Sequence, residues 1–186
     1  MGHKEQIHKG IIDACINGNN KAKYKLYQLY SKAMFNICYR MINNREEAED
    51  MLQEAFTLAF SKLETFRNES SFGSWLKRIV VNTCINSINK KKPDLIYCEE
   101  IYDYDHPMND EEQHLKLSVE NIKNAMNLLP EGGRMVFSLY LLEGYDHTEI
   151  AQILNITEST SKSQFMRAKR RIIEILNEQK FHEYEN

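Results

Sequence analysis

Apolar residues recur every three to four positions along most of this chain, and that spacing constrains the fold more than any other feature. Leu26, Tyr30, Met34, Ile37 and Met41 form one such stripe. This period is typical of an amphipathic helix that buries one face. The chain holds only seven glycines and three prolines, and no stretch alternates apolar and polar residues as a half-buried strand does. We therefore predict an all-α fold.

Turn signals divide this periodic sequence into separate helices. In the first half we predict a short helix within 1–20, a second from Lys21, a third from about Glu46 and a fourth after a polar loop at 65–74. Asn43 and Asn44 are the predicted turn between the second and the third helix. In the second half, the predicted helices lie within 119–130, 134–144, 146–154 and 157–176.

Charge is distributed unevenly along the chain, although the net charge is only −3. Residues 77–92 and 159–171 each contain five basic side chains and no acid, whereas residues 93–116 contain eight acids and one base. The acidic stretch has no helical period, so we expect a flexible linker there. We predict two small helical domains around an acidic linker, with boundaries at 1–92, 93–117 and 118–180.

Residues 146–176 have the pattern of two helices joined by a tight turn. Asp146 and Thr148 are candidate N-caps for the first helix, and Asn155 tolerates the left-handed conformation that such a turn requires. Thr157 is the expected N-cap of the second helix. This is the layout of a helix-turn-helix, in which the N-terminal half of the second helix lies against base edges in the major groove of DNA. A helical hairpin with a solvated basic face is the alternative that this motif alone leaves open.

Ser161 falls where the helical period places an apolar residue. If it faces the core, we expect its hydroxyl to bond to the carbonyl of Thr157, four residues earlier. Phe165 and Ala168 would then seal the helix-turn-helix together with Ile156, which we expect to fill the turn from inside.

Two stretches of the chain together resemble the sigma-70 family of bacterial RNA polymerase sigma factors. The stretch from "EEAEDMLQEAF" to "NSINKKK" (46–92) resembles sigma domain 2, and the stretch from "LPEGGRMVF" to "RAKRRI" (129–172) resembles sigma domain 4. With a short linker and no domain between them, the arrangement resembles the extracytoplasmic-function (ECF) group. Many relatives carry glycine where Asn155 stands, valine where Ser161 stands and an aromatic residue where Gly133 stands.

The resemblance implies an alternative sigma factor that binds core RNA polymerase through its clamp and flap and directs promoter-specific initiation. It also implies contact with promoter DNA and silencing by an anti-sigma factor. The implied docking surface for core polymerase consists of Glu49, Asp50, Gln53 and Glu54. The implied contacts to the −10 element are Arg67, Asn68, Ser71, Trp75, Lys77, Arg78, Asn82 and Asn86. The implied contacts to the −35 element are Thr160, Lys162, Ser163, Gln164, Met166, Arg167 and Arg170.

Other function classes find less support in the sequence. A helix-turn-helix regulator that acts without polymerase would explain residues 118–176 but would leave the first domain without a role. The chain has no glycine-rich phosphate loop and no H-E-x-x-H motif, so we expect neither an enzyme nor a cofactor. The six histidines lack ligand spacing, so we expect no metal site, and His147 is expected to be a surface or capping residue.

The four cysteines, Cys15, Cys38, Cys84 and Cys98, are too far apart in the sequence for a C-x-x-C site. We expect them to be small buried hydrophobic residues in a reducing cytoplasm. No apolar run approaches the length of about 20 residues that a membrane span requires, so we expect no membrane insertion.

Overall fold

The computed structural model describes residues 7–91 and 119–184, with the backbone alone for 119 and 179–184. These residues fall into two compact units, one within 1–93 and the other within 94–186. Every element in the described ranges is helical, which confirms the predicted all-α fold. The predicted linker at 93–117 and Cys98 lie outside the described residues.

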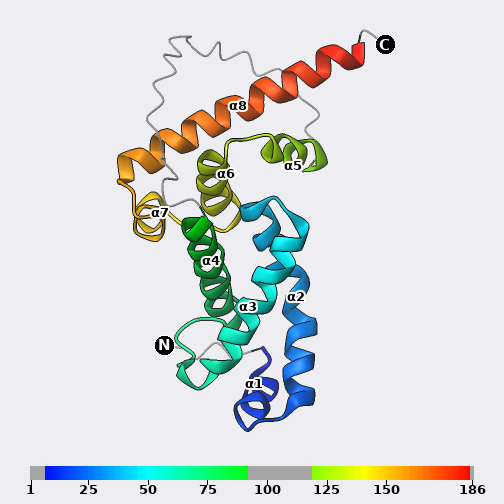
Figure 1. Ribbon diagram of the computed structural model, residues 1–186, viewed down its shortest axis with the longest axis vertical. Helices are drawn as coiled ribbons and strands as arrows, with labels where there is room; N and C mark the ends of the chain where they lie inside the picture. The colour runs from blue at the N-terminus through cyan, green and yellow to red at the C-terminus, as the bar shows by residue number, and fades with distance from the viewer. Residues whose placement is uncertain (1–6, 92–118, 185–186) are drawn as a thin grey trace. The chain divides into compact units, whose positions relative to one another are not determined.

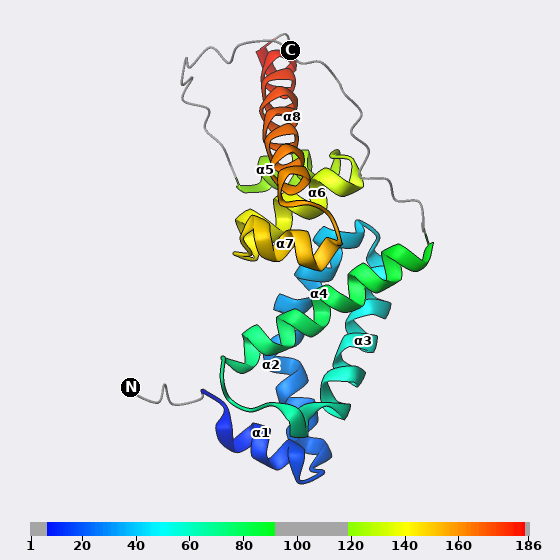
Figure 2. The same ribbon diagram turned by 90° about the vertical axis from the view of Figure 1, so that its left-hand side faces the viewer.

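The first unit is a helical bundle. Its elements are α1 (Lys9–Ile16), α2 (Asn20–Ile42), α3 (Arg45–Ser61), the 3₁₀ turn η1 (Leu63–Thr65) and α4 (Phe72–Lys91). Helices α2, α3 and α4 pack against one another, and α1 packs against α2 (Figures 1 and 2). The apolar stripes predicted from the sequence supply the core, whose fully or nearly fully buried members include Leu26, Met41, Ala48, Leu52, Ala55, Phe56, Leu76 and Val80.

Asparagine side chains set the helix boundaries at the start of this bundle. The side chain of Asn19 accepts a hydrogen bond from the backbone of Ala22 at 3.1 Å and so caps α2. Asn43 ends α2 in the left-handed conformation with φ 56°, and Asn44 caps α3 by accepting from the backbone of Glu47 at 3.1 Å. The predicted Asn43–Asn44 turn is therefore confirmed.

The loop between α3 and α4 is shorter than the sequence pattern predicts. The predicted polar loop spans 65–74, whereas α4 already begins at Phe72. Ser71 makes the early start possible, because its hydroxyl accepts a hydrogen bond from the backbone of Ser74 at 3.1 Å. Phe72 is buried against Tyr30 of α2 and Phe66 of the loop, which holds the first turn of α4 in the core.

The described cysteines are free thiols in the interior of the first unit, as predicted for small buried hydrophobic residues. Cys38 on α2 and Cys84 on α4 are both inaccessible to solvent. A hydrogen bond with Cys38 raises the pKa of the Cys84 thiol above its usual range, and burial raises it further. Burial likewise raises the pKa of the Cys15 thiol.

The second unit is built around one long helix. Its elements are α5 (Val119–Asn127), α6 (Glu131–Phe137), the π-helical turn η2 (Ser138–Leu142), α7 (His147–Leu154) and α8 (Glu158–Tyr184). Helix α8 packs against α5, α6 and α7 (Figures 1 and 2). Buried side chains from α5, α6, α8 and the segment after α5 form one core, which consists of Ala125, Met126, Leu129, Phe137, Ala168, Ile172, Ile175 and Leu176.

The helix predicted within 134–144 starts earlier and changes its winding. It begins at Glu131, directly after Pro130, and its last turn, Ser138–Leu142, is π-helical. Gly144 ends the segment with φ 77°, a left-handed conformation that favours glycine, as its position in the sequence predicts. Gly133 faces α8, and a Cβ there would make an ordinary van der Waals contact with the Cβ of Ala168 at 3.5 Å, so the packing does not require glycine.

Candidate nucleic-acid interface

The turn between α7 and α8 has the hydrogen bonds that a helix-turn-helix requires. Asp146 and Glu149 form a capping box at the start of α7: the carboxylate of Asp146 accepts from the backbone of Glu149 at 2.8 Å, and that of Glu149 accepts from the backbone of Asp146 at 3.0 Å. Asn155 ends α7 with φ 54°, as predicted. Thr157 then caps α8, since its hydroxyl accepts from the backbone of Thr160 at 3.0 Å.

Ser161 faces the interior and is inaccessible to solvent, but the hydrogen-bond partner predicted for its hydroxyl is wrong. The hydroxyl pairs with the Nδ1 atom of His147 at 2.9 Å, whereas the carbonyl of Thr157 accepts the backbone N–H of Ser161. The ring of His147 is half-buried and stacks on Tyr140. The expectation of a surface or capping histidine is therefore also wrong, because Ser161 and Tyr140 draw the ring into the packing between α7 and α8.

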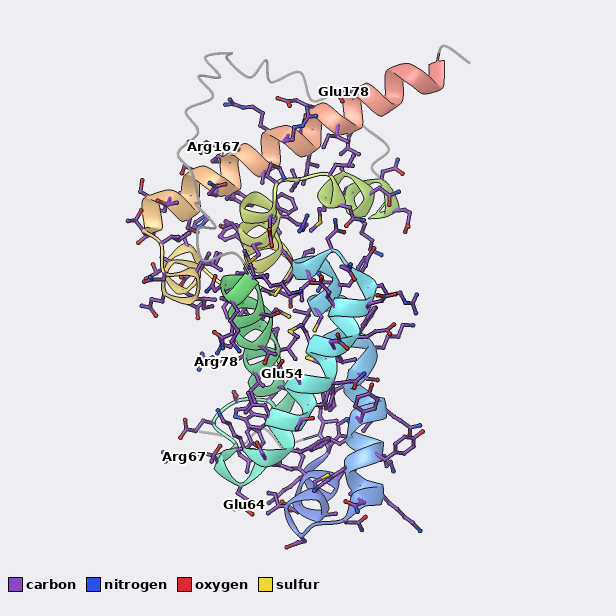
Figure 3. The ribbon with its side chains drawn as sticks, viewed as in Figure 1. Glu54, Glu64, Arg67, Arg78, Arg167 and Glu178 are labelled. Atoms are coloured by element: carbon purple, nitrogen blue, oxygen red, sulfur yellow. The ribbon has the colours of Figure 1, made fainter. Side chains whose placement is uncertain are left out.

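The outward face of α8 carries basic and flexible side chains near its N-terminus. Lys162 and Met166 are exposed, the latter with 53% of its surface accessible, and Arg167 and Arg170 are half-buried. Met166, Arg167 and Arg170 lie on the side of α8 opposite to its buried residues, and Lys162 lies at the edge of that side. Figure 3 shows Arg167 in this N-terminal half of the helix. These four predicted −35 contacts therefore share one surface.

Three other predicted −35 contacts are engaged within the protein. The hydroxyl of Thr160 lies 2.8 Å from that of Thr157 in the cap, and the hydroxyl of Ser163 donates to the carbonyl of Thr160 at 3.0 Å. Gln164 is half-buried at the edge of the α8 surface that faces Gly133 of α6. Thr160 and Gln164 flank the outward face of α8, whereas Ser163 lies on that face near Arg167 and Arg170 with its hydroxyl turned back to the helix backbone.

Acidic partners divide the basic residues of α8 into two groups. The carboxylate of Glu158 lies 2.6 Å from the ammonium of Lys162. This hydrogen bond lowers the pKa of Glu158 below its usual range. Further along the helix, the guanidinium of Arg171 lies 3.0 Å from Glu174 and 3.5 Å from Glu178. Arg171 is thus directed toward the C-terminal half of α8, where Figure 3 shows Glu178.

Helix α4 of the first unit presents most of the predicted −10 contacts on one face. Arg78, Asn82 and Asn86 are exposed and follow one another every four residues, and Trp75 belongs to the same row. Lys77 is half-buried and points to a different side, because two residues along a helix correspond to a rotation of about 200° from Trp75. The structure thus separates Lys77 from the other predicted contacts on this helix.

Trp75 belongs to an aromatic cluster that joins the loop to α4. Its ring lies 5.2 Å from that of Phe66 and 5.6 Å from that of Phe72, and the tryptophan remains half-buried. Part of the ring therefore packs against buried aromatic side chains, and part of its surface remains exposed. Arg67 and Asn68 follow in the exposed loop, where Asn68 adopts φ 59°. Figure 3 shows Arg67 and Arg78 on the same side of the unit.

The four acidic and amide side chains predicted to dock on polymerase are all exposed on α3. Asp50, Gln53 and Glu54 lie on one face, and Glu49 lies at its edge, 3.0 Å from the guanidinium of Arg45. Figure 3 labels Glu54 on this helix. Because Asp50, Gln53 and Glu54 are exposed side by side, their side chains are accessible to an external partner.

Two residues at this interface have no place among the sequence-based candidates. The sequence does not single out Glu158, because an acid in a first turn also stabilises a helix without any further role. The sequence does not link His147 to Ser161 either, because the two lie fourteen residues apart and only the tertiary fold brings them together. No group of three or more His, Cys, Asp or Glu residues suited to a metal ion occurs in the described part of the chain. Among the same residues, no helix is long and apolar enough to cross a membrane.

Comparison with known proteins assigns each unit to a family. A model of Sigma-70 region 2 matches residues 26–93, and a model of Sigma-70, region 4 matches residues 119–172. The chain is 31% identical over 176 residues to the ECF RNA polymerase sigma factor SigW of Bacillus subtilis, which covers 89% of this chain and 94% of the relative. It is 29% identical over 178 residues to the ECF RNA polymerase sigma-E factor of Escherichia coli, with 87% and 90% covered.

Solved structures of sigma factors share the fold. A sigma factor RpoE, crystallised with the anti-sigma factor NepR from Bartonella quintana, aligns with a TM-score of 0.55 and 23% identity over 83% of this chain and 96% of that one. CnrH, in complex with the cytosolic domain of CnrY, aligns with a TM-score of 0.52 and 17% identity, with 90% and 95% covered. The chain belongs to the ECF family of RNA polymerase sigma factors. Its members are regulatory proteins, and this one is an alternative sigma factor that directs transcription initiation.

Proposed function

We propose that the two units divide promoter recognition between them. In this proposal, domain 2 (1–92) docks on core RNA polymerase and reads the −10 element, and domain 4 (118–180) reads the −35 element. Residues 93–117 connect the two as a linker. The observation that carries the proposal is the outward face of α8, where Lys162, Met166, Arg167 and Arg170 surround the N-terminal half of a helix-turn-helix second helix.

Domain 4 has the side chains that major-groove readout needs. Arginine can bind guanine through two hydrogen bonds, and lysine can bind guanine or a phosphate. Lys162 and Arg167 lie on either side of the outward face, so they reach different parts of the groove. Thr160 and Gln164 contribute at the flanks, and Ser163 contributes between Lys162 and Arg167, with its hydroxyl bonded to the carbonyl of Thr160.

Domain 2 has the features of a surface that receives an unstacked base. An aromatic ring with one free side gives a base a surface on which to stack, and Trp75 is half-buried in this way. Asn82 and Asn86 bring amide groups to the same face, and Arg78 brings a positive charge for phosphate. Arg67, Asn68 and Ser71 lie in the adjoining loop. Lys77 would act from another side of the helix, through phosphate rather than through a base.

The acidic face of α3 is the proposed contact with core polymerase. Asp50, Gln53 and Glu54 are exposed together, and Glu49 extends the face. Charged groups of this kind steer association and fix the register between partners. Because relatives with this fold form complexes with anti-sigma factors, we also propose an anti-sigma partner for this chain. We propose that the protein acts in the cytoplasm, without enzymatic activity, cofactor or metal.

Run-off transcription with purified core polymerase on a panel of genomic promoters tests the proposed function. We expect initiation only when the sigma factor and core are combined, and we expect loss of initiation when the −35 or the −10 element is scrambled. If the protein binds promoter DNA tightly and specifically without core, it acts as an independent regulator and the proposal is wrong.

Charge reversal tests the α3 face separately. Glu54→Lys is expected to weaken association with core polymerase by about tenfold or more, since like charges opposed across an interface cost several kcal/mol. Glu64→Lys is the matched control, because Glu64 is exposed on the neighbouring turn η1, away from the acidic face. Surface plasmon resonance measures the affinity of both variants for core polymerase. Equal affinities for the two variants would remove α3 from the interface.

A further inference from the structure

Ser161 places a hydroxyl inside the helix-turn-helix at a position where the helical period favours an apolar side chain. The residue is inaccessible to solvent, and its Oγ atom lies 2.9 Å from Nδ1 of His147. A buried hydroxyl without a partner costs free energy, so the pairing explains how serine is tolerated there. The bond joins α7 to α8, two helices whose relative angle decides where α8 meets DNA.

Side chains from two elements, η2 and α8, hold the ring of His147 in place. It stacks on Tyr140 of η2 with 4.4 Å between ring centroids and 12° between planes. It also meets Phe165 of α8 edge-on at 5.7 Å, and Tyr140 lies 4.7 Å from the same phenylalanine. The imidazole therefore has little freedom to rotate, and its Nδ1 atom is presented to Ser161 in a fixed direction.

The bond joins the far end of α7 to the first turn of α8. His147 is the first residue of α7, whereas the turn follows Leu154, so the length of the helix, about 12 Å, separates them. Ser161 lies one turn into α8. A restraint at the far end of α7 limits the angle between the two helices more than one at the turn, because a given change of angle moves the far end further.

We propose that His147 and Ser161 are positioning residues of the −35 reader, and that their hydrogen bond sets the angle at which α8 enters the major groove. The inference rests on the proposed −35 role of α8. Lys162 and Ser163 follow Ser161 directly on the helix, so any rotation of α8 against α7 displaces them from their contacts. Neither positioning residue needs to touch DNA.

Removal of one partner is expected to lower the −35 affinity more than removal of both partners. Ser161→Val leaves Nδ1 of His147 without its partner, and His147→Phe leaves a buried serine hydroxyl without one. Each single variant is expected to lose about twofold to tenfold in −35 affinity, as the competent arrangement of the helices becomes less populated. In the double variant, valine packs against phenylalanine and no polar group is stranded, so its affinity should lie closer to that of the wild type.

The experiment uses the full chain bound to core polymerase and a fluorescent promoter fragment that the wild-type holoenzyme transcribes. The affinity for this fragment is compared with that for the same fragment with a scrambled −35 element, for the wild type, both single variants and the double variant. Core affinity and the midpoint of thermal unfolding are measured for each protein, so that a loss of folding is not mistaken for a loss of positioning.

Ser138→Ala is the matched control. Ser138 is also a fully buried serine in the second unit, and its hydroxyl has no hydrogen-bond partner among the residues that the structure describes. We expect this variant to retain wild-type −35 affinity. As a direct readout on the free protein, the ¹⁵N chemical shift of Nδ1 in His147 should change in Ser161→Ala and stay unchanged in Ser138→Ala.

Two results would overturn the inference. One is a double variant that loses the product of the two single losses, because independent effects multiply while a shared bond is lost only once. The other is an unchanged Nδ1 shift in Ser161→Ala together with wild-type −35 affinity. If the wild-type holoenzyme itself fails to distinguish the scrambled −35 element, the proposed function fails instead, and the ¹⁵N shift still tests the bond.

Discussion

At the scale of single residues, the interface depends on which charges remain available to DNA. On α8, Lys162 and Arg171 are both paired with glutamates, but their settings differ. Lys162 pairs with Glu158 near the N-terminus of the helix, whereas Arg171 pairs with Glu174 and Glu178 further along it. Exposed pairs of this kind contribute little to stability, so DNA can displace the glutamate from Lys162 at small cost.

Arg167→Ala tests base recognition by α8. If Arg167 contacts a base edge, the variant should cost about 1–3 kcal/mol on the cognate −35 element and much less on a sequence altered at the contacted base. Arg171→Ala is the control, because it removes the same charge from a side chain held by glutamates. Holoenzyme affinities for a set of −35 sequences give the answer. An equal loss on every sequence would identify a phosphate contact.

The buried thiols lead to a prediction about chemical reactivity. The thiolate is the reactive form of cysteine, and a raised pKa lowers its population at neutral pH. The pKa values of Cys15 and Cys84 are raised, and Cys38 is inaccessible to solvent. We expect these three cysteines to resist iodoacetamide at pH 7.5 in the native protein and to react after unfolding in urea. Peptide mass mapping reports each site, and rapid native labelling of Cys84 would contradict its burial.

At the scale of elements, local sequence accounts for the start and end of each helix around the DNA-binding turn. Asp146 and Glu149 define the start of α7, Asn155 defines its end, and Thr157 defines the start of α8. All of these interactions join residues close together in the sequence. For that reason, the capping residues could be predicted without a structure. The π-helical turn η2 could not be predicted in this way, because no local signal in 138–142 distinguishes it from an ordinary helical turn.

Asp146→Ala tests the capping box. The change removes the side-chain acceptor from the first turn of α7 and should destabilise the second unit by about 1 kcal/mol. Asp146→Asn keeps an acceptor oxygen at the same position and should preserve most of the stability. Urea unfolding followed by circular dichroism measures both variants, and hydrogen exchange of the α7 amides locates the effect. Equal stability of Asp146→Ala and the wild type would mean that the cap contributes nothing.

At the scale of the whole molecule, the described residues form two compact units, and each has buried apolar residues of its own. Leu26 is fully buried in the first unit, and Ile172 is buried among the core residues of the second. Because the chain divides into two compact units, we expect damage to one unit to leave the other folded. This organisation suits the proposed reading of two separate promoter elements.

A reciprocal pair of core substitutions tests this independence. Leu26→Ala and Ile172→Ala should each cost about 2–5 kcal/mol, the range for truncation of a large buried side chain. Each loss should be confined to the unit that carries the substitution. Hydrogen exchange measured by mass spectrometry separates the units by peptide. Loss of protection in both units from one substitution would show that they unfold together.

The sequence by itself determined the helices, the helix-turn-helix and the family. These depend on a period of 3.6 residues, on capping side chains and on motif order, all of which are local or linear properties of the chain. The all-α fold and the sigma-factor family are confirmed. The assignment of individual residues to polymerase and to the promoter elements stays a prediction, because no partner is present to test it.

The tertiary structure decided which side chains far apart in the sequence meet in the interior of each unit. It pairs Ser161 with His147, and it brings Cys38 next to Cys84. Helical periodicity states which face is buried but not which side chain on another helix it meets. From the sequence alone, a polar residue on a buried face therefore has no visible partner. The fold gives Ser161 a partner, and the pair becomes part of the DNA-binding geometry.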